Sequence, residues 1–125
     1  MNSINLHPQL DELYKLTEFI SEITSKKDFH VDLIVEEVFV NIVKYSKCNY
    51  INVNVEFNES TLTIELIDNG FEFNPLLKEN PEMPNNIDEA KIGGLGIYLT
   101  KELADDISYK RINDENHLTI IKKYE

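Results

Sequence analysis

The sequence predicts a two-layer α/β sandwich, in which a sheet of four or five strands is covered on one side by three helices. Two observations carry this prediction. Apolar residues recur at helical spacing over residues 10–23 and 31–45, and from Tyr50 onward they alternate with polar residues. Because each helix and strand is then apolar on one side only, helices and sheet are expected to bury those sides against each other.

The first half of the chain is expected to hold a short edge strand and two helices. Residues 2–6 can form the strand, which ends at His7-Pro8 because proline has no backbone N–H to donate. One amphipathic helix is predicted from residues that recur at helical spacing, Leu10, Leu13, Tyr14, Thr17, Ile20 and Ile23. A second helix begins near His30, with Asp28 or Asp32 placing negative charge at its positive end. Its buried stripe is predicted to be Val31, Ile34, Val35, Val38, Ile42 and Tyr45.

The second half is expected to hold two hairpins separated by a long loop and a third helix. The first hairpin pairs residues 51–57 with 62–66 through a turn at Asn58-Glu59-Ser60. The second pairs Ile107–Arg111 with Leu118–Tyr124 around Asn113-Asp114-Glu115-Asn116. Between them, residues 68–92 contain three prolines and little periodicity, and so long a loop in a compact domain tends to be functional. The third helix is predicted from Gly94 to Ala104.

Length and composition predict a single domain over residues 1–125 and exclude several classes of function. The net charge of −11 argues against affinity for nucleic acid or anionic membranes. A single cysteine, Cys48, cannot form an internal disulfide, and the three histidines lack zinc-ligand spacing. The sequence has no apolar stretch long enough to cross a bilayer and no signal-peptide pattern, so we expect a cytoplasmic protein.

Three short segments carry residue types suited to binding a nucleotide. On the second helix, Glu37 and Asn41 lie one turn apart, with Lys44 on the same face. Mg²⁺ accepts one side-chain oxygen while phosphates and waters fill its other positions, so Asn41 can be a metal ligand. Glu37, on the same face, is then placed to activate a hydroxyl or a water beside the metal.

The other two segments follow the first hairpin. Asp68, at the end of a buried strand, can accept a hydrogen bond from an exocyclic amine such as that of adenine, and Gly70 permits close approach of a flat ring. The segment Gly93-Gly94-Leu95-Gly96 opens a helix, where backbone N–H groups can bind phosphate. Each segment alone is a weak signal, because turns and solvated helix faces use the same residues.

In this order and spacing, the three segments resemble the anti-sigma-factor serine kinase branch of the GHKL ATPase superfamily, over about residues 4–124. The first family motif is matched by Glu37 and Asn41. The second is matched by Asp68, Gly70, Phe73 and Pro75, and the third by Gly93, Gly94, Gly96 and the apolar Ile97. The resemblance implies a Bergerat-type, histidine kinase-like fold with a mixed, mostly antiparallel sheet. It also implies that Thr119, in the last strand, supports the adenine-binding aspartate.

The resemblance further assigns a role to each matched residue. Asn41 would bind Mg²⁺, Asp68 the adenine amine, and the glycine segment with Leu95 the phosphates. Glu37 would be the general base; Glu36 points about 100° away around the helix and is the less suitable carboxylate. Lys91 is the best candidate for contact with the terminal phosphate, with Lys44 or Lys101 as alternatives. Residues 76–92 would form a lid.

By the same resemblance, the protein is a regulatory kinase that transfers phosphate from Mg·ATP to a serine of an antagonist protein. It would also sequester a sigma factor or similar partner, and relatives pair as homodimers. A second hypothesis is a binding module that takes up nucleotide and changes its partner preference without transferring phosphate. A third is that the motifs are accidental in a structural α/β domain.

Overall fold

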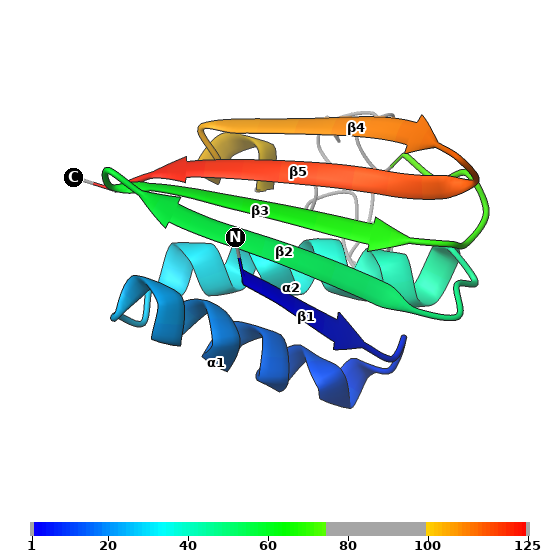
Figure 1. The fold of residues 1–125 in the computed structure, drawn as a ribbon, viewed down its shortest axis with the longest axis horizontal. Coiled ribbons are helices and arrows are strands. Elements are labelled where there is room, and N and C mark those ends of the chain that lie inside the picture. The colour runs from blue at the N-terminus through cyan, green and yellow to red at the C-terminus, as the bar shows by residue number, and fades with distance from the viewer. Residues whose placement is uncertain (1, 75–99, 125) are drawn as a thin grey trace, which may run out of the picture.

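A computed structural model describes residues 2–74 and 100–124 of the protein (Figure 1). It begins with strand β1 (Asn2–Leu6), a short 3-10 helix η1 (Leu10–Glu12) and helices α1 (Leu13–Thr24) and α2 (Phe29–Tyr45). Strands β2 (Ile51–Asn58), β3 (Thr61–Asp68), β4 (Asp106–Ile112) and β5 (Glu115–Lys123) follow. Residues 100–103 are helical, and they are the described part of the predicted third helix.

The strands form one sheet in the order β1-β2-β3-β5-β4. Every pairing among them is antiparallel, and a mixed, mostly antiparallel sheet was expected. The reason is that β2 and β3 form one hairpin, β4 and β5 form another, and β5 joins the two hairpins by running against β3. Helices α1 and α2 lie side by side along one face of the sheet (Figure 1). The predicted two-layer sandwich is therefore confirmed.

The core lies between α1, α2 and the inward positions of the strands. Alternation places the apolar residues of β2 and β3 on the helix side, and Ile51, Val53, Leu62 and Leu66 are fully buried there. The predicted stripe on α2 is buried except at its end, where Tyr45 is 41% exposed. Tyr45 lies in the last turn of α2, beyond the edge of the core, and its ring packs on Phe73, with 5.6 Å between ring centroids.

Local chemistry explains the ends of α2. Asp28 caps the helix, because its Oδ1 accepts a hydrogen bond at 3.1 Å from the backbone N–H of Val31. At the other end, Ser46 closes the helix by donating its backbone N–H to Ile42. Both predicted acids therefore lie at the start of α2, Asp28 as its N-cap and Asp32 in its first turn.

The two hairpin turns are tighter than the sequence predicted. Each has two central residues with positive φ, Glu59 and Ser60 in one and Asn113 and Asp114 in the other. Two-residue turns of this hand match the twist of the strands they join. Strand β5 therefore begins at Glu115 rather than Leu118, which makes Asn116 a strand residue. No helix within residues 2–74 and 100–124 is long and apolar enough to cross a membrane.

Candidate functional site

One face of α2 carries a buried amide beside a half-buried carboxylate. Asn41 is 4% exposed, and its Nδ2 donates to the backbone carbonyl of Glu37 at 2.6 Å. Because the amide nitrogen of Asn41 is bound to the helix backbone, the amide oxygen is the atom that Asn41 can offer to a ligand. A single neutral oxygen suits a Mg²⁺ ion whose other ligands are phosphate oxygens and waters. Among the described residues, no cluster of three or more His, Cys, Asp or Glu could hold a metal by itself.

The Glu37 carboxyl is tuned by its surroundings. Burial raises the pKa of Glu37, the nearby Glu36 carboxylate raises it further, and Lys44 opposes the rise. Lys44 itself is exposed at the last turn of α2. Glu36 is exposed and lines a different groove, between α1 and α2. The two carboxylates therefore differ in their surroundings: Glu37 is the one on the Asn41 side, and its raised pKa suits a group that takes up a proton.

A second buried carboxylate lies at the end of β3. Asp68 is 2% exposed, and its Oδ1 accepts hydrogen bonds from the Gly70 N–H at 2.9 Å and from Asn116 Nδ2 at 3.0 Å. Both bonds use the same oxygen, so they fix the plane of the carboxylate without using Oδ2. A buried, oriented carboxylate of this kind is suited to accepting a hydrogen bond from a ligand amine.

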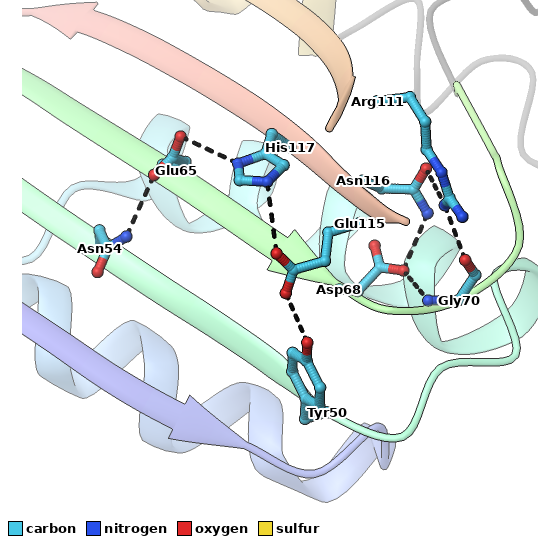
Figure 2. Close-up of polar contacts among 9 residues, drawn as sticks. All are labelled: Tyr50, Asn54, Glu65, Asp68, Gly70, Arg111, Glu115, Asn116 and His117. Carbon is cyan, nitrogen blue, oxygen red and sulfur yellow. Dashed lines mark hydrogen bonds and ion pairs between the residues drawn. The ribbon is translucent and has the colours of Figure 1, made fainter. Parts of the chain in front are cut away.

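Asn116 is the centre of this second cluster, and it was not among the predicted site residues (Figure 2). It is 2% exposed and lies opposite Asp68 in the β3–β5 pairing. Its Nδ2 also donates to the Phe71 carbonyl at 2.7 Å. Its Oδ1 accepts from the Phe73 N–H and from Arg111 Nη1, each at 3.2 Å, and from the Tyr109 hydroxyl. The prediction missed Asn116 because the sequence appeared to place it in a turn, and the tight Asn113-Asp114 turn is the signal that could have found it.

The structure corrects the role predicted for Thr119. Thr119 pairs with Glu65 and not with Asp68, which lies three positions further along β3. Since side chains alternate along a strand, Thr119 also points to the face opposite Asn116, Leu118 and Ile120, which are buried. The support predicted for the Asp68 carboxylate therefore comes from Asn116.

The outer face to which Thr119 belongs carries its own row of polar side chains (Figure 2). Tyr50 donates its hydroxyl to Glu115 at 2.5 Å, and His117 lies between Glu115, at 3.8 Å, and Glu65, at 3.5 Å. Asn54 completes the row by donating to Glu65 at 3.1 Å. This row is separated from Asp68 by the sheet itself, so it belongs to a different surface from the predicted site.

Gly70 has a structural role that differs from the predicted one. A Cβ added at Gly70 would lie 2.7 Å from the carbonyl carbon of Ser46 and 2.8 Å from its Cβ, and closer still to the carbonyl oxygen. The neighbouring Phe71 N–H donates to that same carbonyl at 2.7 Å. The close approach that glycine permits within the protein is thus to the end of α2. It joins the Asp68 loop to the helix that carries Asn41.

Phe73 links the two parts of the site a second time. Its backbone is held by Asn116, and its half-buried ring packs on Tyr45 at the end of α2. Arg111 adds a third link on the strand side, because its Nη1 donates to the Gly70 carbonyl at 2.8 Å. The loop between Asp68 and Phe73 is therefore fixed from both the helix and the sheet.

Several predicted residues lie outside the described part of the chain. These are the phosphate-binding segment, the best lysine candidate and the predicted lid: Gly93, Gly94, Leu95, Gly96, Ile97, Lys91 and residues 76–92. Pro75 also lies outside it. Of the two alternative lysines, Lys44 is exposed on the Glu37 side of α2, and Lys101 is half-buried in the helical residues 100–103. The described site thus consists of the α2 face and the Asp68 loop.

Comparisons with known proteins identify the family and the fold of the chain. The profile of the Histidine kinase-like ATPase domain family matches residues 9–122. Over 96 residues, the chain is 26% identical to the serine/threonine-protein kinase BtrW of Bordetella bronchiseptica, covering 74% of this chain and 68% of that protein. Among solved structures, the histidine kinase AdeS of Acinetobacter baumannii superposes with a TM-score of 0.54 at 12% identity. That match covers 98% of this chain and 68% of AdeS, and it shows a shared fold.

Proposed function

The chain belongs to the histidine kinase-like ATPase domain family and is an ATP-binding domain, and from that premise we propose that it is a protein serine kinase. The observation that carries the proposal is the α2 face, where the half-buried Glu37 lies one turn from the buried Asn41. The similarity to a protein named as a serine/threonine kinase supports it.

ATP would be held at both parts of the site. Asp68 Oδ2 accepts a hydrogen bond from the adenine amine, while Gly70 and Asn116 hold Oδ1. Asn41 supplies one oxygen to Mg²⁺, and the ion supplies neutralisation of phosphate charge when bound. Gly93, Gly94 and Gly96 bind the phosphates through backbone N–H groups, and Lys91, Lys44 or Lys101 contacts the terminal phosphate.

Glu37 acts as the general base in the transfer. Its carboxylate takes the proton of the substrate serine hydroxyl, whose oxygen forms a bond to the terminal phosphorus while the bond from that phosphorus to ADP breaks. The raised pKa of Glu37 favours this uptake, because a base works best when its pKa lies nearer the working pH. Catalysis otherwise consists of positioning and charge neutralisation.

The partners follow from the family resemblance. The substrate is a serine-bearing antagonist protein, the sequestered partner is a sigma factor or similar protein, and the kinase works in the cytoplasm, as a homodimer if it pairs as its relatives do. The net charge of −11 supports a protein partner over nucleic acid or an anionic membrane.

A binding module without transfer is the second candidate. The observation that favours it is that the most fully hydrogen-bonded part of the site, Asp68 with Asn116, serves binding and not transfer. In that case nucleotide alone would change the affinity for the protein partner, and Glu37 would have no chemical role.

The two candidates are separated by Glu37→Gln, with Glu36→Gln as a matched control on the same helix. Each protein is incubated with γ-labelled Mg·ATP and candidate serine-bearing antagonist proteins from the same genome. A kinase should label a serine in the native protein and the Glu36→Gln variant. The Glu37→Gln variant should bind Mg·ATP normally but transfer about 10²–10⁴-fold more slowly. Transfer by Glu37→Gln at the native rate would remove Glu37 from the mechanism, and no label with any acceptor would favour the module.

A further inference from the structure

A groove runs between the first two helices, on the side of α2 that faces away from Asn41. Figure 1 shows α1 and α2 lying side by side on one face of the sheet. The groove has a volume of about 320 Å³. Its lining combines apolar and acidic side chains: Leu10, Asp11, Leu13, Tyr14, Thr17, Asp32 and Glu36.

The apolar part of the groove is unusually open to solvent. Leu10 is 53% exposed and Tyr14, one turn further along, is 64% exposed, with the half-buried Leu13 between them. Single exposed apolar residues are common on protein surfaces, but adjacent ones that line a hollow mark interaction sites. Removing these side chains from water would favour any partner that covers them.

The rim of the groove is acidic. Asp11 and Glu36 are exposed, and Asp32 is paired with Lys27 at 2.9 Å. Lys27 is itself 67% exposed, so three carboxylates and one ammonium group leave a local charge of about −2. This charge attracts basic groups and repels phosphate-rich surfaces. Nucleic acid and anionic membrane are therefore poor occupants.

We propose that this groove docks a basic, amphipathic segment of a protein partner. An apolar side chain of that segment lies between Leu10 and Tyr14, and its lysine or arginine residues face Asp11, Asp32 and Glu36. The docking does not rest on the proposed phosphoryl transfer, because Glu36 and Glu37 point about 100° apart around α2. A partner in the groove leaves the Asn41 side of the helix accessible to nucleotide.

Two other occupants fit less well. In a symmetric pair of copies, both copies use the same patch, so two acidic rims would be brought into one interface. The chain's own residues 75–99 carry four acidic residues against two lysines, so their charge does not complement the rim. The chemistry of the groove thus favours a positively charged segment from another protein.

The test is selection of helical peptides from a displayed random library on the full chain, followed by affinity measurement of the enriched peptides. We expect a consensus with apolar residues at helical spacing and lysine or arginine flanking them. Tyr14→Ser should lower the affinity for the enriched peptides about tenfold, as loss of an aromatic anchor does. Glu36→Lys should lower the affinity for these peptides severalfold or more, because it reverses a charge on the rim of the groove.

The matched control is Glu56→Lys, which makes the same charge change at an exposed position of β2 on the face of the sheet opposite the helices. It should change affinity less than twofold at physiological salt, where distant charges are screened. Melting curves establish that each variant is folded. An acidic or purely apolar consensus, absence of enrichment, or equal weakening by Glu56→Lys and Glu36→Lys would overturn the proposal.

Discussion

Replacing Asn116 with alanine tests the part of the site that the structure added to the prediction. The change removes five hydrogen bonds, two donated and three accepted. Asp68 keeps its bond from the Gly70 N–H, and Arg111 keeps its bond to the Gly70 carbonyl. The Phe71 carbonyl and the Phe73 N–H lose the bonds described for them. One or two unsatisfied groups at ~1–3 kcal/mol each should lower the unfolding free energy by roughly 2–4 kcal/mol.

The same substitution should also weaken the binding of ATP. Without Asn116, the Asp68 carboxylate can rotate, and its hydrogen bond to the adenine amine loses its fixed geometry. Loss of a hydrogen bond to a charged group corresponds to about 1.5–3 kcal/mol, or roughly a 10- to 150-fold rise in Kd. The binding of inorganic triphosphate, which lacks the amine, should be affected much less.

Titration calorimetry with Mg·ATP and with Mg-triphosphate measures both effects, at a temperature where the variant is folded by circular dichroism. Asn116→Thr should recover part of the affinity, because a hydroxyl can both donate and accept. Thr119→Ala is the matched control on the same strand, and it should leave the Kd for ATP unchanged. Unchanged affinity in Asn116→Ala, or a larger loss in Thr119→Ala, would refute this reading of the sheet.

Four further predictions concern the rest of the site. Asn41→Ala should remove the Mg²⁺ dependence of ATP affinity without unfolding the protein; a titration in which added Mg²⁺ still strengthens binding would reject the metal role. Asp68→Asn should weaken the binding of ATP more than the binding of triphosphate, and equal losses of affinity would make Asp68 purely structural. Gly70→Ala should lower the melting temperature in thermal unfolding, because its methyl group would overlap the backbone at the end of α2; an unchanged melting temperature would contradict the packing. Transfer should fall as the pH drops through the raised pKa of Glu37, since the base must be ionised. Because the Glu36 carboxylate contributes to that rise, Glu36→Gln should move this loss to lower pH, and an unmoved pH profile would argue against Glu37.

The elements of the fold could be predicted because each one repeats a simple pattern. The helical stripe of α2 and the alternation in β2 and β3 depend on local spacing, and both were confirmed. The order of strands could not be derived from spacing, since the pairing of β3 with β5 joins residues about 50 positions apart. The mostly antiparallel sheet came from the resemblance and not from spacing, because strand direction depends on tertiary pairing.

The site shows where prediction from residue types fails. Glu37, Asn41 and Asp68 could be picked out because their spacing along a helix or at a strand end limits where they point. Asn116 could not, since asparagine near a turn is common and its register depends on a two-residue hairpin. The packing of Gly70 against Ser46 could not be predicted either, because a glycine in sequence does not show which part of the protein approaches it.

The central claim is that the α2 face and the Asp68 loop together form the Mg·ATP site. The most direct test is to follow backbone amide signals of the full chain by NMR while Mg·ATP is added. The account predicts large shifts at Gly70, Phe71, Asn116 and the turn of α2 around Asn41, with little change at His117 on the outer face of the sheet. Shifts confined to the outer face, or none at millimolar Mg·ATP, would contradict it.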